Sequence, residues 1–574
     1  MEAGEILLKR GLLDRQQLER SRSQANGHCD GLRLIESAVH LGYCSEEQAL
    51  RAVGEAVGID YIDLNGIDVD LSLLKGFPHK LIHRQTIFPI SRNQGQLVVA
   101  TSDPFDLYPL DEVSAATGLS VLPVLAGRAE ISRLIKRYLG VGSETVDGLV
   151  AAQSHDEESA VELLSDIETD GSELSEQAQE ASVVRLVNEI LMEAIDARAS
   201  DVHIESQPSG VVIRYRIDGM LQTQPVPPEI NRFQAAIISR LKIMARLNIA
   251  EKRLPQDGRM KLRINGREID VRVSIIPMIH GEGLVLRILD KGAMTFDLQK
   301  LGMEADTYAA FRVLIDLPHG IILVTGPTGC GKTTTLYSAL LEINQPDVKI
   351  ITTEDPVEYQ LEGINQIQVH TKIGLTFGHS LRSILRHDPD IVLVGEIRDL
   401  DTAENAIQAS LTGHLVFSTL HTNDAATAYT RMVDMGVEPF LVASTVEAVM
   451  AQRLVRRLCL SCKQEYRPDR KDVPVDFPFD ALGGGKIFRA VGCRECRGTG
   501  YRGRQGIYEL MVTTNEIRQL AHDRASSWKL AQMSIEQGMR TLRQDGWKKV
   551  LAGISSVDEV VRNAKADHGL MMKK

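Results

Sequence analysis

The sequence contains no run of about eighteen apolar residues, which is the minimum for a membrane-spanning helix. Its first residues, Met1-Glu2-Ala3-Gly4-Glu5, have neither the basic nor the apolar stretch of a secretory signal peptide. These two absences argue against a membrane-integral or secreted protein. We therefore expect a cytoplasmic chain that reaches a membrane only through partner proteins.

The sequence also has no excess of basic residues. Its net charge is -12, and the imbalance is local, because residues 141–180 hold twelve Asp and Glu and no Lys or Arg. Removing those twelve from the 77 acidic residues leaves 65, equal to the 65 Lys and Arg. Balanced folded regions argue against a nucleic-acid-binding surface. The acidic segment is rich in Ser and Gln with few aromatics, so we predict a flexible linker over 141–181.

Cysteines are few, and their spacing is uneven. Cys29, Cys44 and Cys330 are scattered, whereas the other four form two C-x-x-C pairs. Without a secretion signal, such pairs indicate metal ligands rather than disulfides. Four thiolates fill a tetrahedral zinc site completely, so we expect a structural Zn²⁺ rather than a catalytic one. The predicted ligands are Cys459, Cys462, Cys493 and Cys496.

The central feature is an apolar β-branched run at 321–325 that stops at a glycine-rich segment and continues into an amphipathic helix. The segment fits G-x-x-x-x-G-K-[ST], in which backbone N–H groups cradle phosphates, the lysine reaches the β- and γ-phosphates and the hydroxyl ligates Mg²⁺. We therefore predict ATP and Mg²⁺ as ligands. The predicted binding residues are Gly326, Pro327, Thr328, Gly329, Cys330, Gly331, Lys332, Thr333 and Thr334, with Thr333 on Mg²⁺.

Three further segments carry acids or histidines at strand ends, where open α/β sheets place functional groups. Glu354 and Glu358 end the first strand, Glu396 ends the second, and His421 ends the third. Glu396 stands where a Walker B strand usually has Asp. Hydrolysis needs an acidic group to orient or deprotonate water, and we favour Glu396 slightly over Glu354 for that role. The sequence does not decide between them.

The regions before this core are predicted to contain both helices and strands. Residues 1–60 predict two similar helical units, with Asp14 and Ser45 as N-caps. Strand and helix patterns alternate over 59–139, which indicates an α+β domain. After the linker, an amphipathic helix starts at 182. Asn265-Gly266 then predicts a two-residue hairpin turn between strands whose outer face displays arginines.

Together, Gly326 to Thr333, 353–359, 395–399 and 413–424 resemble the Walker A, Asp, Walker B and His boxes of secretion traffic ATPases. Within that superfamily the sequence looks most like the type II secretion ATPase, GspE. The pilus extension ATPase, PilB, is the near alternative.

The resemblance implies a multidomain α/β fold with a RecA-like P-loop core and a preceding PAS-like α+β domain. It also implies a homohexamer in which Arg272 and Arg287 reach the next subunit's nucleotide, with Arg382 and Arg386 as weaker candidates, and a catalytic role for His421. The implied domains are 1–58 (helical), 59–140 (α+β), 141–181 (linker), 182–295 (α+β), 296–455 (core), 456–510 (zinc-binding) and 511–574 (C-terminal helices).

Some relatives bind cyclic di-GMP through repeated Arg-Leu-Gly motifs. The corresponding segments here, Glu2-Ala3-Gly4 and Arg33-Leu34-Ile35, are both incomplete, which argues against that ligand. The predicted function is an ATPase that powers type II secretion with inner-membrane platform proteins and without direct contact to nucleic acid. A pilus extension motor and a nucleotide-gated scaffold with little turnover remain alternatives, and a nucleic-acid translocase is disfavoured by the charge balance.

Overall fold

The computed structural model divides the 574-residue chain into two compact units, residues 1–292 and 293–574, which are described separately. Among the described residues, none of the helices combines the length and apolarity needed to cross a bilayer. The described residues are 3–24, 31–64, 69, 73–74, 77, 81–82, 85–93, 95–106, 108–139, 161–163, 180–264, 266–290 and 296–566.

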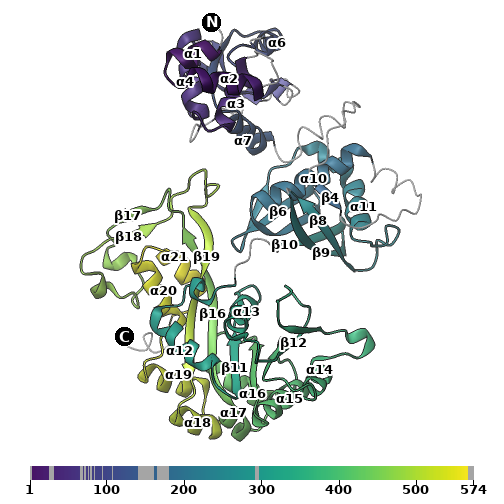
Figure 1. Ribbon diagram of the computed structural model, residues 1–574, viewed down its shortest axis with the longest axis vertical. Helices are drawn as coiled ribbons and strands as arrows, with labels where there is room; N and C mark the ends of the chain where they lie inside the picture. Colours follow the sequence, from purple (N-terminus) through teal and green to yellow (C-terminus); the bar gives the residue numbers. More distant parts are fainter. Residues whose placement is uncertain are drawn as a thin grey trace. The chain divides into compact units, whose positions relative to one another are not determined.

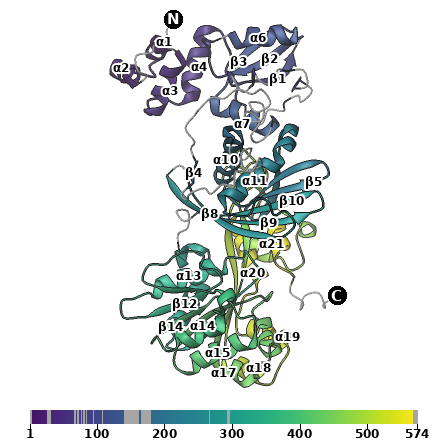
Figure 2. The same cartoon turned by 90° about the vertical axis from the view of Figure 1, so that its right-hand side faces the viewer.

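The first unit begins with a small helical bundle (Figure 2). Its helices are α1 (Ala3–Lys9), α2 (Arg15–Gln24), α3 (Gly31–His40) and α4 (Glu46–Val57). Both predicted N-caps are confirmed. Asp14 accepts from the Gln17 N–H at 2.7 Å, and Ser45 forms a reciprocal capping box with Gln48.

A three-stranded sheet follows in the order β1-β2-β3, flanked by helices α6 and α7. This confirms the alternating strand and helix pattern predicted over 59–139. The elements are β1 (Ile87–Asn93), β2 (Gln96–Thr101), α6 (Tyr108–Thr117), β3 (Val121–Leu125) and α7 (Arg128–Leu139).

The remainder of the first unit is a seven-stranded sheet in the order β4-β8-β9-β10-β5-β6-β7. Helices α10 (Ala181–Asp196) and α11 (Gln234–Met244) share one apolar core with its inner face. The predicted hairpin is confirmed by pairing of Ile264 with Arg267, although Asn265 lies outside the described residues. The strands are β4 (Val161–Leu163), β5 (Ala199–Gln207), β6 (Gly210–Ile217), β7 (Met220–Gln224), β8 (Gln256–Ile264), β9 (Arg267–Met278) and β10 (Gly281–Asp290).

Part of the segment predicted as a linker belongs to this sheet. Residues 161–163 form β4, which pairs antiparallel with β8. Positions 140–160 and 164–179 lie outside the described residues. Because the segment is acidic overall, a composition argument does not predict this short strand, Val161-Glu162-Leu163.

The second unit is built on a seven-stranded sheet in the order β13-β12-β14-β15-β11-β16-β19. All neighbouring strands are parallel except β16 and β19, which pair antiparallel. The strands are β11 (Gly320–Thr325), β12 (Ile350–Glu354), β13 (Asn365–Gln368), β14 (Ile391–Val394), β15 (Leu415–Leu420), β16 (Val446–Leu458) and β19 (Tyr501–Val512).

Both faces of this sheet are covered, which explains its near-continuous apolar strands. In β11, Ile322 and Val324 join a core with α12 and α13, whereas Ile321 and Leu323 join a core with α14 to α17. Because side chains alternate between the two faces of each strand, both faces of the sheet pack against helices. The helices are α12 (Ala305–Ile315), α13 (Lys332–Ile343), α14 (Phe377–Ile384), α15 (Leu400–Leu411), α16 (Ala426–Asp434) and α17 (Pro439–Thr445).

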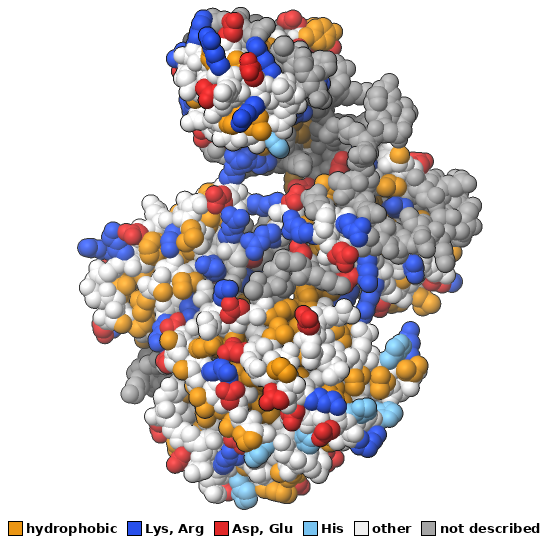
Figure 3. All heavy atoms as spheres, in the orientation of Figure 1, with side chains coloured by type: hydrophobic (Ala, Val, Ile, Leu, Met, Phe, Trp, Pro, Cys, Tyr) orange, Lys and Arg blue, Asp and Glu red, His pale blue; other side chains and the backbone are white. Residues whose placement is uncertain are grey.

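Strands β16 and β19 run together beyond the sheet toward a two-stranded arm of β17 (Gln464–Tyr466) and β18 (Ile487–Arg489) (Figure 1). The predicted domain boundary at 455/456 therefore falls inside β16. The last helices, α18 (Asn515–His522), α19 (Ser527–Glu536), α20 (Leu542–Leu551) and α21 (Val557–Asn563), pack into the same apolar core as α15. On the face drawn in Figure 3, acidic and basic side chains are interspersed over this unit.

Candidate nucleotide-binding site

The glycine-rich segment joins the carboxyl end of β11 to the start of α13. Gly326, Gly329 and Gly331 have φ angles of 148°, 79° and 92°, a backbone region that side chains rarely adopt. A Cβ atom on Gly326 would lie 2.5 Å from the Gln452 carbonyl oxygen and 2.7 Å from the Cys330 sulfur. Only glycine fits there, so the loop can turn tightly. The turn places the loop backbone at the N-terminus of α13, where N–H groups favour an anion.

Lys332 is the first residue of α13, and its side chain folds back over the loop. Its Nζ donates to the carbonyl oxygens of Gly326 at 2.8 Å and Pro327 at 3.3 Å. Burial lowers the pKa of Lys332, and the nearby charge of Glu396 opposes that shift. Lys332 and Glu396 are therefore close enough to interact electrostatically.

Glu396 follows β14, the strand next to β15 in the sheet. Its side chain is only 12% exposed, and one carboxylate oxygen forms an ion pair with Arg398. The other oxygen lies 3.1 Å from Nε2 of His421, which follows β15. Strand order thus brings together Lys332, Glu396 and His421, which are far apart in the sequence.

Glu354, at the end of β12, has a different environment. Its carboxylate accepts hydrogen bonds from the Thr352 hydroxyl at 2.5 Å, the Gln366 amide at 3.1 Å and the Tyr337 hydroxyl. The residue is 4% exposed. The pKa of the Tyr337 hydroxyl is raised, chiefly by burial and next by the charge of Glu354. Three donors therefore tie this carboxylate into the contact between the sheet and α13.

We expect Glu354→Gln to destabilise the protein by about 1–3 kcal/mol, because an amide N–H₂ would face one of these buried donors. Thermal unfolding would measure the effect, with Glu362→Gln as a control because Glu362 is an exposed glutamate in the same segment. An unchanged unfolding temperature for Glu354→Gln would show that the three donors do not depend on a carboxylate.

Three other residues predicted near this site, Glu358, Arg382 and Arg386, lie beyond β12 or on and just after α14. Glu358 is half-buried four residues beyond β12. Arg382 pairs with Asp401 at 2.8 Å, and Arg386 donates to the Arg382 carbonyl oxygen at 2.9 Å.

Arg272 and Arg287 belong to the first unit and are direct cross-strand neighbours on β9 and β10. Arg287 is 52% exposed and lies 3.1 Å from Asp201. Arg259 on β8, which sequence reasoning missed, pairs with Arg272, so three arginines form one row on the outer face. Like charges directly opposite on neighbouring strands are destabilising, and such a row is suited to an anion. The strand register was the signal that could have predicted Arg259.

The four predicted cysteines come together in the second unit, where β16 leads into Cys459. Their sulfur atoms all lie within 4.8 Å of one another. The Cys459–Cys493 and Cys462–Cys496 sulfur distances are both 3.8 Å. A tetrahedral Zn²⁺ with 2.3 Å bonds places its sulfurs about 3.8 Å apart, so the donor set and its spacing fit that ion.

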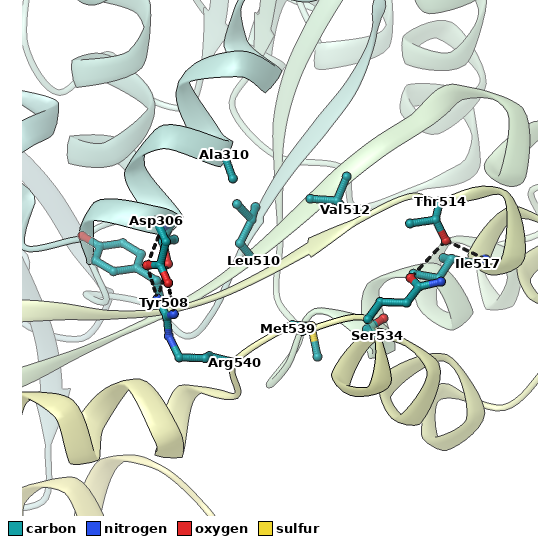
Figure 4. A pocket seen from close by; sticks show the side chains of 13 residues that line it. Asp306, Ala310, Tyr508, Leu510, Val512, Thr514, Ile517, Ser534, Met539 and Arg540 are labelled. Carbon is teal, nitrogen blue, oxygen red and sulfur yellow. Dashed lines mark hydrogen bonds and ion pairs between the residues drawn. The ribbon is translucent and has the colours of Figure 1, made fainter.

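A separate cavity of about 220 Å³ lies between α12, β19 and the loop before α20 (Figure 4). Leu510, Val512 and Met539 line its apolar part. At one end Arg540 forms a bidentate ion pair with Asp306. None of the predicted nucleotide residues lines this cavity.

A parallel sheet with a phosphate loop after one strand and an acid after another defines the class of P-loop nucleotide-binding proteins. The chain matches the family described as "Type II/IV secretion system protein" over residues 176–562 and the "MshEN domain" over 57–145. The chain belongs to the Type II/IV secretion system protein family.

The similarity to curated relatives extends over most of the chain. It is 44% identical to the Type II secretion system protein E of Xanthomonas campestris, over 97% of this chain and 97% of that protein. It is 41% identical to the Type IV pilus assembly ATPase PilB of Myxococcus xanthus, over 98% and 99%. It is 50% identical to the Putative type II secretion system protein E of Escherichia coli K12, over 83% and 94%.

Proposed function

We propose that this chain hydrolyses ATP at the phosphate loop and couples hydrolysis to type II protein secretion. The observation that carries the ATPase proposal is the convergence of Lys332 and Glu396 at the carboxyl ends of strands β11, β15 and β14. Family membership and the relatives named as secretion proteins support the coupling.

In the proposed reaction, loop N–H groups and Lys332 hold the triphosphate. The Thr333 hydroxyl would hold Mg²⁺, which neutralises charge on the β- and γ-phosphates when bound. Glu396 orients a water and accepts its proton as the water oxygen bonds to the γ-phosphorus and the bond to the ADP oxygen breaks. His421 and Arg398 hold the Glu396 carboxylate in place. The buried hydrogen bonds of Glu354 favour Glu396 as the base.

The arginine row on the first unit supports a second part of the proposal. Arg272 and Arg287 would supply positive charge to the γ-phosphate bound by a neighbouring subunit of a homohexamer. Arginines in cross-strand register, here the half-buried Arg272 and the exposed Arg287, can act together on one polyanion.

For the four cysteines we propose a structural Zn²⁺ that fixes the arm of β17 and β18 to the end of β16. Metal analysis is expected to return about one zinc per chain. Cys496→Ser is expected to reduce the zinc content severalfold and to lower the unfolding temperature, because a structural metal contributes binding energy to folding. Cys44→Ser, outside the cluster, is the control. Wild-type protein with much less than one zinc per chain would contradict this proposal.

Phosphate release separates a motor from a nucleotide-gated scaffold. The wild-type protein is expected to release phosphate continuously from ATP in a Mg²⁺-dependent reaction. Binding of ATP without repeated turnover would favour the scaffold. Stimulation by single-stranded DNA, and not by cytoplasmic domains of membrane partners, would favour a translocase.

The second candidate function is pilus extension, which the 41% identity to PilB favours. Deletion of the gene separates the two: loss of secreted enzymes with pili intact supports secretion, and the reverse supports extension.

In either role we propose a cytoplasmic location at the inner membrane, reached through platform proteins. Both incomplete Arg-Leu-Gly motifs argue against cyclic di-GMP as a ligand, and titration of the protein with that nucleotide tests this.

A further inference from the structure

Strand β16 passes directly beside the phosphate loop. It is the neighbour of β11 on the side away from β15, and the last pair between them joins Thr325 to Ala451. The next residues of β16 therefore continue alongside the loop that follows Thr325. The backbone of Gln452 confirms this, because its carbonyl oxygen would lie 2.5 Å from a Cβ atom on Gly326.

Arg453 lies on this strand two residues after Ala451, the last residue of β16 that pairs with β11. Its Nη2 donates to Oδ1 of Asn423 at 2.8 Å. Asn423 lies in the segment after β15 that crosses the carboxyl end of β11, where the Thr422 N–H donates to the Thr325 hydroxyl at 2.9 Å. The Arg453 guanidinium is therefore held by a segment that contacts Thr325, the residue before the phosphate loop.

A second positive charge at this place has an electrostatic effect on the loop. For the Cys330 thiol, burial raises the pKa, whereas the charges of Lys332 and Arg453 lower it. Two cations that repel each other beside a phosphate-binding helix terminus are both stabilised by a bound polyphosphate.

We propose that Arg453 contacts the phosphates of the nucleotide from within the same subunit, and that Asn423 is the positioning residue that orients its guanidinium. This inference rests on the proposed ATPase function. It adds a cation from the chain's own core to those expected from Arg272 and Arg287. The planar guanidinium offers several donors in fixed geometry, which matches phosphate oxygens better than an ammonium does.

A structural alternative is that Arg453 only ties β16 to the segment after β15. Two substitutions distinguish the roles. Arg453→Gln keeps a side-chain donor for Asn423 and removes the charge, whereas Arg453→Lys keeps the charge and removes the fork. Arg457→Ala, at an exposed arginine on the same strand, is the matched control.

The test measures kcat and KM for Mg²⁺-ATP and the binding of a fluorescent ATP analogue, with thermal unfolding to confirm folding. We expect Arg453→Gln to lower kcat/KM about 10²–10³-fold, the scale seen when one charge-stabilising donor is removed. Arg453→Lys should lose less, Asn423→Ala should lie between the wild type and Arg453→Gln, and Arg457→Ala should match the wild type.

Wild-type kcat/KM in Arg453→Gln, or equal losses in the Gln and Lys variants, would overturn the inference. Lys332→Ala assayed alongside separates this failure from failure of the ATPase proposal. If Lys332→Ala is inactive while Arg453→Gln is not, only the role of Arg453 is wrong.

Discussion

Phosphate release by a Lys332→Ala chain is expected to fall below about a hundredth of the wild-type rate, because the lysine supplies charge that the transition state needs. Lys332 is half-buried, and its Nζ is already directed at the loop by the carbonyl oxygens of Gly326 and Pro327. Removing it therefore leaves the cradle without its central cation. ATP affinity should fall as well, because we propose that the same ammonium contacts the bound phosphates.

The control for this change is Lys372→Ala, since Lys372 is an exposed lysine of the same unit. It should retain wild-type turnover. Thermal unfolding of Lys332→Ala should stay close to that of the wild type, because the lysine contacts only loop carbonyl oxygens. Undiminished turnover in a folded Lys332→Ala protein would place hydrolysis elsewhere.

The second large effect is expected from Glu396→Gln. An amide cannot accept a proton from water, so kcat should fall about 10²–10⁴-fold, the usual contribution of a general base. ATP binding should remain within a few fold of the wild type, because Glu396 does not hold the phosphates. The separation of kcat from binding distinguishes this variant from Lys332→Ala.

Two comparisons isolate the role of Glu396. Glu404→Gln alters an exposed glutamate on α15 and should have no effect. Glu354→Gln should lower stability, with a smaller loss of kcat than Glu396→Gln. If Glu354→Gln instead abolished turnover while Glu396→Gln retained it, the assignment of the base would be reversed.

The sequence predicted those parts of the site that depend on local pattern. The spacing of glycines and lysine after a β-branched run specifies a phosphate loop wherever it occurs in a parallel sheet. Two C-x-x-C pairs predict a four-cysteine cluster, because this spacing is typical of metal ligands. The structure brings the four cysteines together and begins α13 at Lys332, directly after the glycine-rich segment.

The different environments of Glu354 and Glu396 could not be predicted. Both are acids at the ends of buried parallel strands, and the pattern treats them alike. Their difference comes from Tyr337 on α13 and Gln366 on β13, which surround only Glu354. Such contacts depend on the order of strands in the sheet, which one sequence does not specify.

Strand β16 was not predicted from the sequence, for a related reason. The cysteine pair at its end suggested a separate domain, although the strand runs without interruption from Val446 to Leu458. The predicted boundary at 455/456 divides this strand, and the sequence pattern does not indicate that Arg453 lies beside the phosphate loop. The parallel pairing of β16 with β11 is the fact that assigns it to the site.

The most direct test of hydrolysis at this loop is a crystal structure of Glu396→Gln with Mg²⁺ and ATP. We expect the γ-phosphate within hydrogen-bonding distance of the Lys332 ammonium and a water between residue 396 and the phosphorus atom. An empty loop, with the nucleotide bound at another place on the chain, would contradict the proposed function.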